Sequence, residues 1–230
     1  MLDKFKNQIA DALSARRDSD TPRMTVAVLP VAVFTFLFCI FSVYVVPGDK
    51  PPEFNFQEGG AVTALSAIYL TLSCAFAYAA NLIHFRKTGS HQILWLILAA
   101  GFAFLAFDEL MQFHERFGRI VIDRIIPRTF FRNWNDAIVI LYGFIALPIM
   151  VLLLPKILKY RMVIELFAVS FAFYVIHTAI DSIVDPPTLT SNILEESAKL
   201  FSTAFMFLGA YAGLLGNTWL YIGEPDSRKD

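Results

Sequence analysis

Ionisable residues follow an apolar run in the stretch FAFLAFDELMQFHER, residues 102–116. The run is suited to a lipid bilayer, yet it ends in Asp108, Glu109, His114 and Glu115. Acids and histidines in a membrane segment are costly unless they are paired or hydrated. Their presence therefore indicates a functional site.

Helical phase separates these residues, provided that one helix continues through all of them. At about 100° per residue, Asp108, Gln112 and Glu115 fall on one face, with Glu109 at its edge. His114 lies about a third of a turn away from that face. We therefore expect His114 to lie at the membrane interface, or to support the site residues without being one of the metal ligands.

Other apolar segments also carry ionisable residues. The transmembrane topology predicted below places these residues at the same depth in the membrane. His177 and Asp181 are four residues apart, a spacing at which one helix presents two ligands to one ion. The remaining candidates at this depth are Asp136, Glu195, Glu196 and Lys199. Asp136 also has the spacing of a capping residue, and Glu195 with Lys199 has that of a helical ion pair.

A divalent metal site is the chemistry that these residue types favour. Imidazole with carboxylates and without thiolates suits zinc, iron or manganese, in a mononuclear or a carboxylate-bridged dinuclear site. The ion would activate water or oxygen while a carboxylate moves protons. The predicted ligands are Asp108, Glu115, His177, Asp181 and Glu195, and the predicted catalytic acids are Glu115, Glu195 and Glu196. Glu109, Gln112, His114, Asp136 and Lys199 are expected to support them or to lie at the interface.

Composition places these residues in a membrane protein. Of 230 residues, 57% are hydrophobic and only 17% are charged, which is typical of polytopic membrane proteins. The net charge of −1 provides no basic field for nucleic acid. Six segments are long enough to cross the hydrocarbon core as helices, which satisfy their own backbone groups. They are residues 24–46, 61–84, 92–114, 135–155, 162–184 and 194–221.

The predicted fold is thus an all-α, polytopic integral membrane bundle of about six helices. A six-helix domain spans residues 24–222, after an amphipathic or flexible segment at 1–23 and before a short tail at 223–230. Lysine and arginine residues gather in both terminal segments and in the connections that follow the second and fourth spans. The positive-inside rule then predicts that both termini are cytoplasmic, in a plasma membrane of the bacterial inner-membrane type. The ionisable cluster would be extracytoplasmic.

The connection at residues 116–132 opposes this orientation, because it is rich in arginine and falls outside. Its arginines alternate with large apolar residues. Such a mixture suits a helix lying in the membrane interface. The alternative is a docking surface for another membrane subunit.

Small residues recur in the last span at Gly209, Gly213 and Gly216. Small residues at this kind of spacing let neighbouring helices approach closely. We therefore expect this stripe to be a packing surface.

Three functions remain open from the sequence. The first is a metal-dependent membrane enzyme that acts on a lipid or another amphiphile. The second is a non-catalytic subunit of a larger membrane complex, and the third is a proton- or cation-coupled transporter. The absence of a polar ladder in the cytoplasmic half argues against the transporter, because a continuous path would need one.

Overall fold

A computed structural model describes residues 2–17, 24–46, 48, 50–117, 134–160, 162–184 and 188–222. The regular elements of these residues are all helical. In chain order they are α1 (Leu2–Arg17), α2 (Met24–Tyr44), the 3-10 helix η1 (Pro52–Phe56), α3 (Ala61–Thr88), α4 (Ile93–Met111), α5 (Phe113–Phe117), α7 (Trp134–Ile157), α8 (Val163–Ile183) and α9 (Leu189–Ile222). The prediction of an all-α chain is confirmed.

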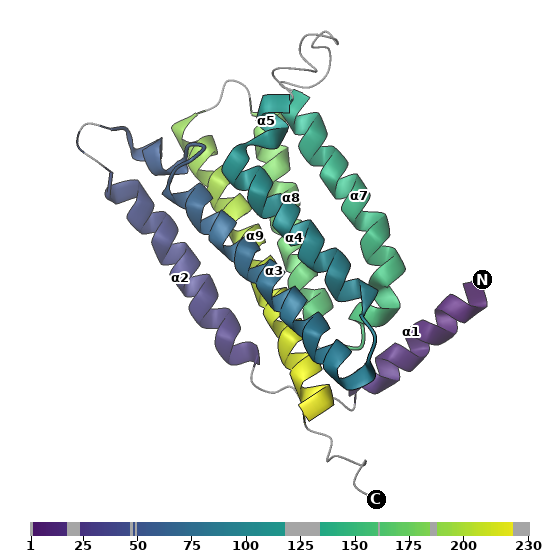
Figure 1. Ribbon diagram of the computed structural model, residues 1–230. Helices are drawn as coiled ribbons and strands as arrows, with labels where there is room; N and C mark the ends of the chain where they lie inside the picture. The colour runs from purple at the N-terminus through teal and green to yellow at the C-terminus, as the bar shows by residue number, and fades with distance from the viewer. Residues whose placement is uncertain are drawn as a thin grey trace, which may run out of the picture.

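Six helices of the described chain, α2, α3, α4, α7, α8 and α9, are long and apolar enough to cross a membrane. This number agrees with the predicted spans. The bounds differ most for α9, which begins five residues earlier than expected at Leu189, and for α3, which continues to Thr88 instead of ending at 84. The helix α4 ends at Met111 instead of continuing to 114. Successive long helices run in opposite directions, and α1 lies at the same end of the bundle as the end of α9 (Figure 1).

The helix α9 forms the centre of the bundle and packs mainly against α3 and α8, while α3 also packs against α4. Its glycines make this contact possible. A Cβ atom on Gly209 would lie 2.5 Å from the Phe167 ring, and one on Gly213 would lie 2.1 Å from the Trp95 ring. The glycine stripe is a packing surface, as expected, and it receives aromatic rings of neighbouring helices.

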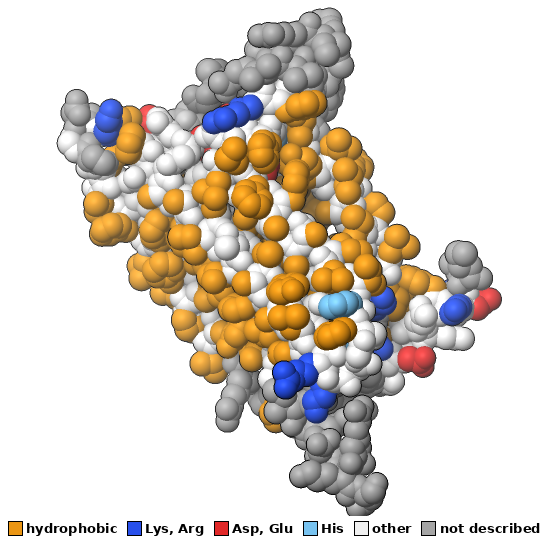
Figure 2. Space-filling model, in the orientation of Figure 1, with side chains coloured by type: hydrophobic (Ala, Val, Ile, Leu, Met, Phe, Trp, Pro, Cys, Tyr) orange, Lys and Arg blue, Asp and Glu red, His pale blue; other side chains and the backbone are white. Residues whose placement is uncertain are grey.

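The sides of the bundle are apolar and its charges lie towards the ends. Figure 2 shows hydrophobic side chains over most of the visible face, with lysine and arginine side chains towards both ends. Phe144 and Leu152 of α7 are 69% and 74% exposed, and Leu29 of α2 is 68% exposed. Exposed side chains of this kind on membrane-length helices are suited to contact with lipid. The molecule thus has the surface of a membrane protein.

The end of the bundle near the start of α4 is closed by a hydrogen-bonded network of polar side chains. The Tyr160 hydroxyl oxygen lies 2.9 Å from Asn217 Oδ1 and 3.2 Å from Gln92 Oε1, and its single O–H is directed at these two acceptors. Asn81 bonds His91 Nδ1 at 2.9 Å and accepts the Gln92 backbone N–H at 3.0 Å. Asn81 and Asn217 are fully buried, so the bonds to the Asn81 amide and to Asn217 Oδ1 satisfy groups that would otherwise destabilise the fold, whereas Asn217 Nδ2 has no partner among the described residues. The network fixes the short connection between α3 and α4.

Candidate metal centre

The helix that carries the opening stretch breaks at Gln112. Gln112 has a φ of 54°, in the left-handed region, and its N–H donates to the Asp108 carbonyl at 2.7 Å. The chain then begins the short helix α5 at Phe113. The Asp108 carboxylate caps this new turn, since Oδ1 accepts the His114 backbone N–H at 2.9 Å.

The break overturns the expected phase of the ionisable residues. Asp108, Gln112 and Glu115 do not share one helical face, because the helix does not continue from α4 into α5. His114 does not point away from Asp108 either: its Nδ1 lies 2.9 Å from Asp108 Oδ2. The prediction that His114 stands apart from that face is therefore wrong, for the reason that it assumed an unbroken helix.

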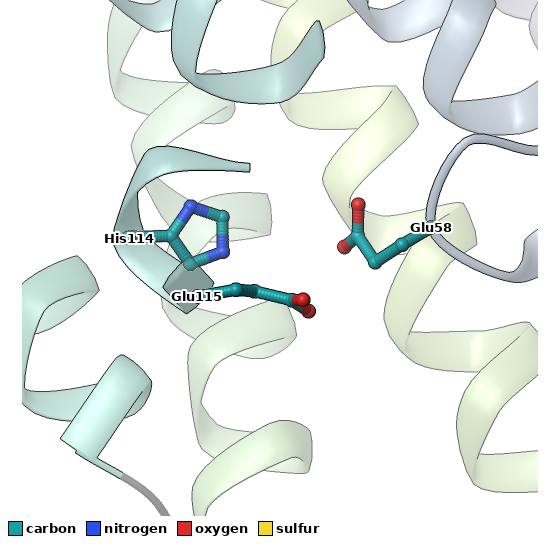
Figure 3. Close-up of side chains that lie close together, drawn as sticks. All are labelled: Glu58, His114 and Glu115. Carbon is teal, nitrogen blue, oxygen red and sulfur yellow. The ribbon is translucent and has the colours of Figure 1, made fainter. Parts of the chain in front are cut away.

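Three side chains at this end lie close enough together to hold a metal ion. One ligand atom each from Glu58, His114 and Glu115 lies within 4.8 Å of the others. His114 and Glu115 come from α5, and Glu58 comes from the turn between η1 and α3. Figure 3 shows the two acids and the imidazole directed towards one common region. Two segments that are distant in the sequence therefore meet there.

Glu58 was missed because it belongs to a connection and not to an apolar span. In the predicted topology, the connection between the first and second membrane spans lies on the same side of the membrane as the ionisable cluster. The sequence signal that could have identified Glu58 was therefore an acid on that side, in the stretch QEGG just before α3. Helical periodicity could not reveal it, since the residue is outside any α-helix.

Asp108 contacts one ring nitrogen of His114, the kind of partner that metal-binding histidines have. A carboxylate on one ring nitrogen fixes the tautomer and leaves the other nitrogen for an ion, as in carboxylate–histidine–metal arrangements. Burial by itself lowers the pKa of His114. The hydrogen bond and the charge of Asp108, with the charge of Glu58, outweigh that effect and raise the pKa above its usual value. The protonated, cationic form of His114 is therefore favoured over the neutral imidazole.

Lys199 of α9 lies beside the metal-compatible group, in contact with three acids. Its Nζ is 2.8 Å from Glu196 Oε2, 3.3 Å from Glu109 Oε1 and 3.3 Å from Glu58 Oε1. The side chains of Lys199, Glu109 and Glu196 are at most 12% exposed. A buried ammonium and buried carboxylates are tolerated only when they are paired in this way. Glu58 links this cluster to His114 and Glu115.

The other predicted ligands lie between α8 and α9 or on α8. His177 is buried, and its Nδ1 lies 3.9 Å from Glu195 Oε1. Among the described residues, this Nδ1 has no hydrogen-bond partner. Of the predicted ligands Asp108, Glu115, His177, Asp181 and Glu195, only Glu115 belongs to the three-residue group that meets the geometric requirement in the described chain. Asp108 supports that group through His114.

Two predictions fall outside what the structure describes. Asp136 lies in α7, but its side chain is not among the described ones, and neither are residues 118–133. The interfacial or docking role expected for residues 116–132 remains a prediction.

A protein family described as a domain of unknown function, DUF8692, matches residues 42–212. The chain belongs to this family. Glu58, Asp108, His114, Glu115 and Lys199 all lie inside the matched DUF8692 segment, whereas α1 precedes it. The candidate centre is therefore contained within the DUF8692 domain. No curated protein and no solved structure matches the chain.

Proposed function

We infer that this DUF8692 protein is a membrane metalloprotein whose centre is formed by Glu58, His114 and Glu115. The observation that carries this inference is the convergence of three ligand atoms within 4.8 Å. The Asp108 hydrogen bond to His114 Nδ1 supports it, because that bond directs the second ring nitrogen of His114 to an ion.

The donor set favours zinc, iron or manganese. One imidazole and two carboxylates are of intermediate hardness, and the group contains no thiolate. Three protein ligands are typical of catalytic sites, which leave a coordination position for water or substrate. The proposed ion would supply the acidity that converts bound water into a nucleophile near neutral pH.

We propose a metal-dependent enzyme acting on a lipid or another amphiphile. The centre is at the end of a bundle with apolar sides, where the polar head of an amphiphile would lie while its chains stay in the membrane. Leu110, Phe113 and Phe117 beside the centre are 62%, 43% and 55% exposed, and they would contact such chains. Glu109 and Glu196 are the nearby carboxylates that could move protons.

The activity is tested with purified protein in lipid nanodiscs, after removal of metal and reloading with zinc, iron or manganese. A panel of phospholipids, sphingolipids and acyl esters is incubated with the protein and followed by mass spectrometry. We expect turnover of at least one class that requires metal and is lost in Glu58→Gln. Metal binding with no turnover across the panel would reject the enzyme and retain the metalloprotein.

We further propose that the centre faces the extracytoplasmic side and that both termini are cytoplasmic. The arrangement of positive residues in the sequence supports this orientation. Single cysteines are introduced at Ser90 and at the exposed Gln57 in a variant that lacks Cys39 and Cys74. A membrane-impermeant thiol reagent added to intact cells should label position 57 and leave position 90 unlabelled; the reverse pattern would contradict the orientation.

A further inference from the structure

The ammonium of Lys199 has the surroundings of a bound cation. Its Nζ lies 2.8–3.3 Å from three carboxylate oxygens, from the turn before α3, from α4 and from α9. An ammonium can donate three hydrogen bonds. The three acids contact this ammonium from different elements, and the Lys199 side chain is only 12% exposed. Its role is therefore that of an internal cation.

Glu58 belongs both to this shell and to the metal-compatible group. Its Oε1 lies 3.3 Å from Lys199 Nζ, and its carboxylate also provides one ligand atom near His114 and Glu115. Carboxylates shared in this way bridge the two ions of dinuclear metal sites, which lie about 3.5–4 Å apart. The two cation positions at this centre are thus joined by Glu58.

The charges also suit two divalent ions. When ionised, Glu58, Glu109, Glu115 and Glu196 carry four negative charges, and all four belong to the two joined groups. One divalent ion with the Lys199 ammonium supplies three positive charges, and two divalent ions would supply four. The acids could therefore accept a second divalent ion in place of the ammonium without an excess of positive charge.

We propose that Lys199 occupies the second position of a carboxylate-bridged dinuclear centre, which keeps the native centre mononuclear. Around the ammonium, Glu58, Glu109 and Glu196 are more widely spaced than the first group, so a metal that replaces the lysine side chain would draw these three acids together into a second site. This inference rests on the proposed metal centre. Because the second site has oxygen ligands alone, it selects hard cations such as manganese, magnesium or calcium, whereas the first site uses an imidazole.

The test measures manganese bound to the wild type, Lys199→Ala and Lys199→His in nanodiscs, by equilibrium dialysis and electron paramagnetic resonance. We expect about one Mn²⁺ per wild-type chain and about two in the variants, with the spectrum of an exchange-coupled pair. Lys87→Ala, at the other end of α3, is the matched control and should match the wild type. Adding Glu109→Gln to Lys199→Ala should remove the second ion and leave the first.

The possible failures are distinguishable. Folded Lys199 variants that bind one uncoupled Mn²⁺ would overturn the inference and leave the proposed metal centre intact. Failure of both variants to fold even with manganese present would also overturn it, because the metal then cannot replace the ammonium. A wild type that binds no metal would instead reject the proposed function. In that case a single ion in Lys199→Ala, lost with Glu109→Gln, would still identify the second position.

Discussion

His114 Nδ1 lies 2.9 Å from Asp108 Oδ2 across a break in the helix, and Asp108 Oδ1 accepts the His114 backbone N–H at the same distance. One carboxylate thus both starts α5 and orients the imidazole. The bend at Gln112 lets His114 and Glu115 approach Glu58, which arrives from a connection before α3. The convergence of Glu58, His114 and Glu115 therefore depends on this bend.

Asp108→Asn should weaken metal binding without unfolding the protein. The side chain keeps its shape, but its amide can donate to Nδ1 and favour the tautomer with a proton on Nε2, the nitrogen needed by the ion. Changes of this kind in the partner of a metal-binding histidine typically cost about 10–100-fold in affinity. Competition with a fluorescent chelator measures the loss. Asp11→Asn in the exposed part of α1 is the control, and equal affinities in the two variants would contradict this role of Asp108.

The stability of the metal-free protein should depend on the protonation of His114. Its pKa is raised in the folded state, despite burial, by Asp108 and Glu58. The stabilising contribution is therefore fully present below the unfolded-state pKa and is lost as the pH rises through the folded-state pKa. The difference in melting temperature between wild type and His114→Gln should shrink over that interval. A difference that grows with pH would contradict the assignment.

Gln112→Gly should stabilise the protein. Gln112 has a φ of 54°, and the left-handed conformation costs a residue with a Cβ about 1–2 kcal/mol, which glycine avoids. Part of this gain is offset by the greater freedom of glycine in the unfolded chain. Thermal unfolding in detergent should therefore show a modest rise for Gln112→Gly and a fall for Gln112→Val. A clear fall for the glycine variant would show that the glutamine side chain makes a contact that outweighs the strain.

Gly213→Ala should destabilise the bundle, because the new methyl group would overlap the Trp95 ring at 2.1 Å. Trp95 is fully buried, so it has little room to move, and overpacking of this kind costs about 1–3 kcal/mol. Gly101→Ala in α4 is the matched control, since no atom lies within 4 Å of its Cβ position. Its stability should be unchanged or slightly higher. Equal melting temperatures for the two variants would contradict the close packing of α9 on Trp95.

The six long helices were predictable because apolar length is a property of each segment alone. The residues at which these helices begin and end were less predictable. α9 begins at Leu189, five residues before the expected bound, because its polar first turns lack the apolar signal used to find a span. The sequence still indicated that acids of α4 and α9 would lie at one end, where Glu109 and Glu196 do meet Lys199.

The ligand group could not be derived from helical phase. Nothing in DELMQFHER marks Gln112 as a left-handed residue, because a glutamine there has no preference for that conformation. The break is stabilised by Asp108, whose carboxylate reaches the next turn. Glu58 lies in a connection, where periodicity carries no information. The break at Gln112 and the approach of Glu58 to His114 both depend on contacts between segments, which helical periodicity does not report.

Metal content is the most direct test of the proposed centre. The protein is expressed with zinc, iron and manganese supplied and purified without chelators, and bound metal is measured by plasma mass spectrometry. We predict about one ion per chain in the wild type and in the control His84→Ala, and a loss of most of the metal in Glu58→Gln, His114→Ala and Glu115→Gln. A wild type free of metal, or three ligand variants that retain it fully, would contradict the proposed centre.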